Sequence, residues 1–218
     1  MARSTSQIAL PLDWSAGGSN DAPLVIGTSN ADAIRYLRHV ATWPVRTAVL
    51  TGPRGSGRSL IGRLFAAETG GRVIDGHDSV SEEEIFHAWN AAQSSNIPLL
   101  IIADAPPSEW GIALPDLASR LRAVPVLTIA EPDDCLARDL IEALFAQRGI
   151  ALAPEVAAYI VPRMERSYAM IHRVVAALDA ASLEQGRRVG IRLTRETLLS
   201  QGLIDPDLLE RQDVDICR

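Results

Sequence analysis

The residues best suited to chemistry form one glycine-rich stretch in the first third of the chain. Residues 52–59 read G-P-R-G-S-G-R-S and fit the pattern G-x-x-x-x-G-[K/R]-[S/T] of a phosphate-binding loop. The glycines let backbone N–H groups curl around a polyphosphate, and a helix that begins at the loop adds partial positive charge. The pattern predicts a nucleotide site. The residues expected to contact the nucleotide here are Gly52, Pro53, Arg54, Gly55, Ser56, Gly57, Arg58, Ser59 and Leu60.

The last two residues of the pattern, Arg58 and Ser59, are those expected to bind phosphate and metal through their side chains. The Ser59 hydroxyl is the group expected to meet Mg²⁺. Arg58 stands where lysine is usual, but all 21 basic residues of this chain are arginine. Its planar guanidinium is bulkier than an ammonium group and donates hydrogen bonds differently. The alternative interpretation is a glycine-rich turn between a strand and a helix that binds nothing.

The elements that would position this loop alternate between strands and helices. Short aliphatic runs predict strands at 47–51, 72–75, 99–103 and 124–129, and the four-aliphatic run at 99–102 indicates a strand buried on both faces. After Pro132 only helical patterns follow. The order predicts an α/β fold with a parallel core and a small all-helical lid. Helices are expected at 28–40, 59–69, 81–94, 113–121, 133–148, 154–166, 168–186 and 194–202.

Composition narrows the class of protein. Hydrophobic residues make up 47% and charged residues 22% of the 218 residues, as in a soluble globular protein. No apolar run approaches the roughly 18 residues that span a bilayer, and the start of the chain lacks a secretory pattern, so we expect a cytoplasmic location without membrane contact. A net charge of −6 argues against a surface that coats DNA.

Five segments together resemble the Hda branch of the DnaA-type AAA+ proteins, which inactivate the bacterial replication initiator. Residues 7–12 (QIALPL) are similar to the sliding-clamp-binding motif of that branch, and residues 25–30 to the segment that cups adenine. Residues 114–121 resemble the motif that carries the arginine finger. Residues 132–134 and 163–167 resemble lid segments of the alphaproteobacterial members. The resemblance rests on the order and spacing of these segments, and it extends over nearly the whole chain.

The resemblance implies a role for each segment. Gly27 and Asn30 would contact the nucleotide, which would be ADP or ATP with Mg²⁺. Arg120 would act in trans as an arginine finger on a bound DnaA; the alternative is an ordinary solvated arginine on an amphipathic helix. The polar tail at 1–22 would bind the sliding clamp of DNA polymerase. The residues expected to do so are Gln7, Ile8, Leu10, Pro11 and Leu12.

Two assignments of the Mg²⁺-binding carboxylate remain open. Taken alone, the strand at 99–103 followed by Asp104 is a Walker B strand with Asp104 on the metal. The resemblance instead makes residues 99–104 the sensor-1 strand and leaves Asp75 as a degenerate Walker B residue, with one strand and one helix deleted after the phosphate loop. We prefer the second assignment. Asp75 is followed by Gly76 rather than an acidic residue, so independent hydrolysis is expected to be weak or absent.

The organisation expected from the sequence is a flexible tail at 1–22, a nucleotide-binding core at 23–131 and a helical lid at 132–218. The function expected is a DnaA-related AAA+ regulator that binds adenine nucleotide and the clamp and promotes ATP hydrolysis by DnaA. The alternatives are a nucleotide-independent scaffold that binds the clamp or DnaA, and a stand-alone P-loop NTPase. About 15 residues follow the last expected helix, too few for a helix-turn-helix, so direct sequence-specific DNA binding is not expected.

Overall fold

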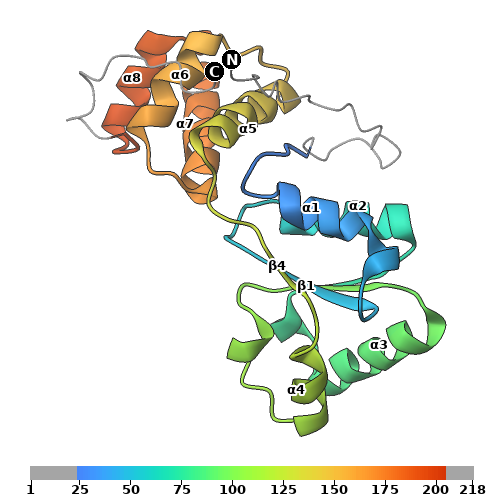
Figure 1. Ribbon diagram of the computed structural model, residues 1–218. Coiled ribbons are helices and arrows are strands. Elements are labelled where there is room, and N and C mark those ends of the chain that lie inside the picture. Colours follow the sequence, from blue (N-terminus) through green and yellow to red (C-terminus); the bar gives the residue numbers. More distant parts are fainter. Residues whose placement is uncertain (1–23, 205–218) are drawn as a thin grey trace, which may run out of the picture. The chain divides into compact units, whose positions relative to one another are not determined.

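The computed structural model of the protein describes residues 24–204 (Figure 1). The described chain divides into two compact units, one made by residues 29–131 and the other by residues 24–28 together with 132–204. The expected clamp-binding residues 7–12 lie outside the described part. None of the helices between residues 24 and 204 has the length and apolar character of a membrane span.

The first unit is built on a sheet of four parallel strands, β1 (Thr47–Thr51), β2 (Arg72–Asp75), β3 (Leu99–Ile102) and β4 (Val126–Thr128). The strand order is β2-β3-β1-β4, so β1 and β3 are central and every residue of both is buried. Their unbroken aliphatic runs are what a strand covered on both faces requires. In register, Val49 lies between Ile101 of β3 and Val126 of β4. The four-stranded parallel sheet confirms the prediction from sequence.

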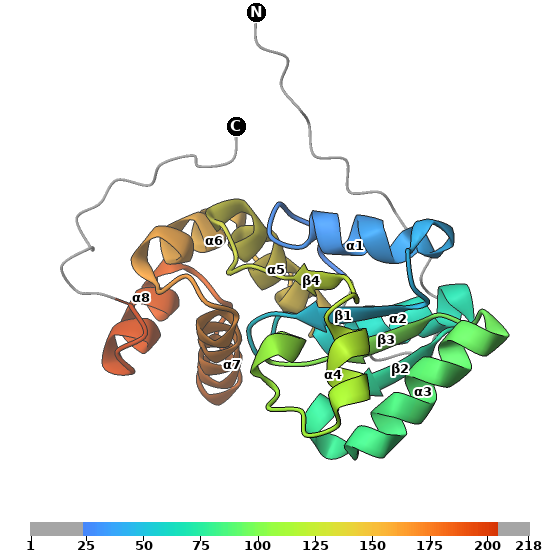
Figure 2. The same ribbon diagram turned by 60° about the horizontal axis from the view of Figure 1, so that its bottom comes forward.

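Helices cover both faces of this sheet (Figures 1 and 2). On one face lie α1 (Ala31–Arg38) and α2 (Arg58–Thr69), and on the other α3 (Glu82–Ser95) and α4 (Pro115–Leu121). Ser81 begins α3 with a complete capping box, in which its side chain and that of Glu84 each accept a backbone N–H. The core under α3 and α4 contains buried residues of both helices, of three strands and of the segment before β4: Val49, Ile74, Ile85, Ala88, Ala92, Leu99, Ile101, Leu117, Leu121 and Val124.

The second unit is a helical domain made mainly of α5 (Asp134–Gln147), α6 (Pro154–Ile160), α7 (Tyr168–Gln185) and α8 (Ile191–Ser200). The buried residues of α7 recur at helical spacing, so one stripe of this helix faces the domain core. Side chains cap two of the helices, because Asp133 accepts the Leu136 N–H at 2.7 Å and Ser167 accepts the Met170 N–H at 3.2 Å. The fold therefore matches the α/β core followed by helices that the sequence predicts.

Two helices of the second unit depart from their expected bounds. The helix expected to run to residue 166 ends as an α-helix at Ile160, and residues Val161–Arg163 form a 3₁₀ turn. Pro162 explains this change because proline has no N–H to continue the α-helical hydrogen bonds. The last helix begins at Ile191 after Gly190, and Thr194, expected as its starter, is instead fully buried inside it.

Candidate functional site

The glycine-rich loop joins the central strand β1 to the first turn of α2, as the phosphate-loop pattern requires. Gly55 and Gly57 have φ of 83°, in the left-handed region that favours glycine. Gly52 is needed for space as well as for its φ of 152°, because a Cβ atom there would lie 2.8 Å from Cβ of Ile129 and 2.9 Å from its carbonyl oxygen. The backbone of this loop therefore depends on glycine at these positions.

Two features of the loop suit a bound phosphate. Among residues 24–204 no side chain caps the N-terminus of α2, and the first residues of this helix carry backbone N–H groups without partners inside the helix. The Ser56 side chain is buried, with the residue 7% exposed, and its Oγ has no hydrogen-bond partner among residues 24–204. A buried hydroxyl without a partner is costly, and a phosphate oxygen would supply one. The residues present therefore fit a polyphosphate.

The two arginines of the loop converge on one carboxylate, that of Asp104. Arg58 donates from Nη2 to Asp104 Oδ1 at 2.6 Å and from Nη1 to the carbonyl oxygen of Ala103. Arg54 donates from Nε and Nη2 to Asp104 Oδ2 at 3.2 and 3.1 Å. The hydrogen bond from Arg58, and then that from Arg54, holds the pKa of the Asp104 carboxyl below its ordinary value. Both cationic side chains of the loop are thus paired with a residue of the same chain.

The strand order decides which carboxylate reaches the loop. Asp104 follows β3, which lies beside β1, and so contacts the loop directly. Asp75 ends β2, which β3 separates from β1, so it stands about two strand spacings away, or about 10 Å. Ser59 lies in the first turn of α2 and is exposed. Within residues 24–204 no cluster of three or more His, Cys, Asp or Glu could hold a metal ion. Magnesium, which often keeps waters and substrate phosphates as ligands, would therefore need the nucleotide to complete its shell.

The two residues expected near adenine fall in different units of the chain. Asn30 is 4% exposed and is the residue before α1, where its carbonyl oxygen accepts the Ile34 N–H at 3.0 Å. Its side chain does not cap the helix. Gly27 belongs to the helical unit and approaches α5 so closely that a Cβ would lie 3.0 Å from Cβ of Leu136.

Arg120, the expected finger, lies in the last turn of α4 with 26% of its side chain exposed. Its guanidinium pairs with Asp116 one turn earlier, from Nε at 3.2 Å and from Nη2 at 2.9 Å, and Nη1 donates to the Asn90 side-chain oxygen. It also lies over two rings of α3, 4.5 Å from the Phe86 centroid and 4.7 Å from the Trp89 centroid. Arg120 is therefore fixed in place rather than solvated on all sides.

Sequence reasoning did not identify Trp89 and Asp116 as partners of Arg120. The signal available was spacing: Asp116 precedes Arg120 by four residues, and Phe86, Trp89 and Asn90 share one helical face. That these two faces meet depends on how α3 packs against α4, which neither pattern specifies. We refer below to Phe86, Trp89, Asn90 and Asp116 as the Arg120 holder.

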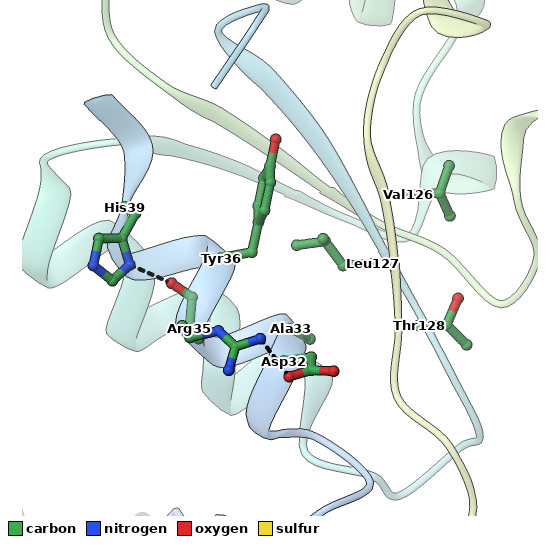
Figure 3. A pocket seen from close by; sticks show the side chains of 8 residues that line it. All are labelled: Asp32, Ala33, Arg35, Tyr36, His39, Val126, Leu127 and Thr128. Carbon is green, nitrogen blue, oxygen red and sulfur yellow. Dashed lines mark hydrogen bonds and ion pairs between the residues drawn. The ribbon is translucent and has the colours of Figure 1, made fainter. Parts of the chain in front are cut away.

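A separate open pocket of about 500 Å³ lies between α1 and the edge strand β4 (Figure 3). Its polar side includes Asp32 and Arg35, which form an ion pair at 2.7 Å, and His39, whose Nδ1 lies 2.7 Å from the Arg35 carbonyl oxygen. None of the residues expected to bind nucleotide lines this pocket. It is therefore distinct from the phosphate loop.

One known protein family matches part of the helical unit. A family model described as "Hda, lid domain" matches residues 137–198, which run from the first turns of α5 through most of α8. The match lies within the helical unit and includes none of the sheet.

Comparison with solved structures places the fold of the chain. Domain III of the replication initiation protein DnaA from Thermotoga maritima is similar at 17% identity and a TM-score of 0.65, over 84% of this chain and 95% of that one. DnaA from Aquifex aeolicus bound to AMPPCP is similar at 15% identity and a TM-score of 0.58, over 82% and 70%. The RuvB Holliday junction branch migration motor of Thermotoga maritima is similar at 13% and 0.58, over 80% and 70%. The chain thus has the fold of these DnaA and RuvB structures, and residues 137–198 of its helical unit match the family model of the Hda lid domain.

Proposed function

We propose that the protein is a regulatory AAA+ protein that promotes ATP hydrolysis by the replication initiator DnaA, and so limits repeated initiation of chromosome replication. The observation that carries this proposal is the Hda lid domain at residues 137–198 on the same chain as a phosphate loop. In this account the protein acts in the cytoplasm. DnaA and the sliding clamp are its partners.

The phosphate loop is the proposed site for ADP or ATP. Its support is the strand–loop–helix context, the glycines that need positive φ, and the buried Ser56 hydroxyl that lacks a partner among the described residues. When bound, Mg²⁺ would neutralise phosphate charge, with Ser59 and either Asp75 or Asp104 as its protein ligands. The nucleotide complexes of DnaA proteins support the assignment by analogy of fold.

Arg120 is the proposed active group on DnaA. A guanidinium that reaches the phosphates of a partner stabilises the charge of the transition state and contributes about 10³–10⁵ in rate in the proteins that use one. Such a group works best when it is positioned before the reaction, because the cost of orienting it is then already met. The contacts of the Arg120 holder support this role.

Weak intrinsic hydrolysis is part of the proposal. Hydrolysis of the protein's own nucleotide needs a carboxylate on Mg²⁺ and a second group that orients water. Asp104, the carboxylate beside the loop, is paired with Arg54 and Arg58, and Asp75 is one strand farther away. We therefore expect ADP or ATP to bind with little turnover.

Three experiments together test this function. They are calorimetry with ADP and ATP, a phosphate-release assay, and a pull-down with purified clamp and DnaA. Binding of nucleotide, capture of both partners and release of phosphate far below the ~1 s⁻¹ of ordinary enzymes are expected. The absence of any heat of binding at tens of micromolar protein would refute the nucleotide site. Turnover of ~1 s⁻¹ or more by the protein alone would instead identify a stand-alone NTPase.

One observation favours an alternative, a scaffold that holds clamp or DnaA without nucleotide. Both arginines of the loop already have an anionic partner in Asp104. Thermal unfolding with and without nucleotide distinguishes the two functions, because a ligand at 100 times its Kd adds about 2.7 kcal/mol of stability. We expect ADP or ATP to raise the midpoint. An unchanged midpoint at millimolar nucleotide would favour the scaffold.

A further inference from the structure

The contact between Asp104 and the phosphate loop uses the donors that a phosphate would need. Arg58 occupies the position of the motif whose side chain reaches the β- and γ-phosphates. In the structure its Nη2 is bonded to Asp104 Oδ1 at 2.6 Å, and its Nη1 to the Ala103 carbonyl oxygen. The Arg58 side chain is only 11% exposed, so few other positions are open to it.

Asp104 also contacts a second arginine of the loop. Arg54, four residues before Arg58, donates two hydrogen bonds to Asp104 Oδ2. Both donors meet the same carboxylate oxygen, and a phosphate oxygen is an anionic acceptor of the same kind for a guanidinium group. The carboxylate therefore stands in the chemical place of a phosphate group, with one oxygen for each arginine.

The conformation of the loop has support besides its contact with Asp104. Its turn is set by glycines with positive φ and by the strand and helix on either side. The Asp104 side chain is 55% exposed and that of Arg54 is 88% exposed, so their ion pair is a surface contact of the kind that contributes little to stability. A function in ligand binding explains the arrangement better than a function in folding.

We propose that Asp104 is a resident competitor of the nucleotide phosphates for Arg58 and Arg54, and that it sets the affinity of the loop. A phosphate enters by exchange: Asp104 leaves the guanidinium groups as the phosphate oxygens replace it. Each nucleotide must therefore offset the loss of these ion pairs, and affinity is lower than the loop alone would give. This inference rests on the proposed nucleotide site, and it identifies Asp104 as the residue that regulates the affinity of that site.

The test is the Kd of ADP measured by calorimetry in EDTA, where a metal-binding role of Asp104 cannot offset the effect. Asp104→Asn keeps the size of the side chain and removes its charge, and it should bind ADP about three- to tenfold more tightly than the unaltered protein. Asp104→Glu keeps the charge and should bind within about twofold of the unaltered protein. Glu68→Gln, an exposed change near the far end of α2, alters the net charge equally and should have no effect.

The outcomes separate this proposal from the proposed function. Equal binding by Asp104→Asn and the unaltered protein would overturn the competition and leave the nucleotide site in place. Weaker binding by Asp104→Asn would also overturn it, since Asp104 would then organise the loop for its ligand. A failure of both proteins to bind ADP would overturn the competition and the proposed nucleotide site together. If Glu68→Gln lowered the Kd of ADP as much as Asp104→Asn does, the effect would come from net charge alone. That result would contradict a specific role for Asp104.

Discussion

Glu82, in the first turn of α3, accepts the backbone N–H of Leu114 at 2.8 Å, through Oε2. Its other oxygen, Oε1, accepts the N–H of Ala113 at 2.9 Å. Leu114 is the residue before α4, so one carboxylate joins the start of α3 to the start of the helix that carries Arg120. The far end of α4 is joined to α3 by the Arg120 holder, and α4 is therefore fixed against α3 at both ends.

Glu82→Ala should loosen α4 while leaving the phosphate loop intact. Two hydrogen bonds to a charged acceptor are lost, so we expect the free energy of unfolding to fall by about 1–3 kcal/mol. Stimulation of DnaA should fall about tenfold or more, because displacing a transition-state group by about 1 Å costs up to about 10²-fold. Thermal unfolding and phosphate release by DnaA measure the two effects. Glu83→Ala removes an exposed carboxylate from the same turn and is the matched control. Equal losses in both variants would contradict the positioning role of Glu82.

Gly52→Ala and Gly57→Ala should differ in stability although both glycines have positive φ. A Cβ at residue 52 meets Cβ and the carbonyl oxygen of Ile129 within 3 Å, whereas one at residue 57 meets no atom within 4 Å. The backbone must move in the first case, so we expect Gly52→Ala to cost about 1–3 kcal/mol more than Gly57→Ala, which has only the strain of a left-handed alanine. Thermal unfolding of the two variants side by side measures this difference. If Gly57→Ala were the less stable of the two, the close approach of Gly52 to Ile129 would not govern the loop.

Much of the fold could be predicted because individual patterns determine it. The aliphatic runs at Leu99–Ile102 and Thr47–Thr51 are typical of buried strands, and the short stretch between the loop and Asp75 leaves room for one helix and one strand. Helix ends were less predictable because a single residue shifts them, as Pro162 does after Ile160.

The site was predictable where it is local in sequence and not where it depends on neighbouring elements. The loop at 52–59 is contiguous, so its residues and its strand–helix context could be read from the chain. The pairing of Arg58 with Asp104 follows from the position of β3 beside β1, and the strand patterns do not specify that order. The aromatic contacts of Arg120 likewise follow from the packing of α3 against α4.

Deletion of residues 1–12 should abolish clamp binding and leave nucleotide binding unchanged. The apolar residues at 8–12 lie in a polar segment that cannot form a core of its own, so we expect them to be buried in a groove on a partner. A peptide this short loses entropy on ordering, and we expect a Kd on the order of micromolar for the unaltered protein. Surface plasmon resonance on immobilised clamp measures it. Deletion of residues 2–6, which keeps the apolar residues at 8–12, is the control and should bind normally. Clamp binding that survives the longer deletion would place the clamp contact elsewhere on the chain.

The rate of ATP hydrolysis by DnaA, measured as phosphate release with the sliding clamp loaded on DNA, tests the central claim most directly. The unaltered protein should accelerate hydrolysis, and Arg120→Ala should return the rate to that of DnaA alone while still binding clamp and nucleotide. Arg122→Ala, which removes an exposed arginine two residues later, should accelerate hydrolysis as the unaltered protein does. Full stimulation by Arg120→Ala, or none by the unaltered protein, would contradict the account.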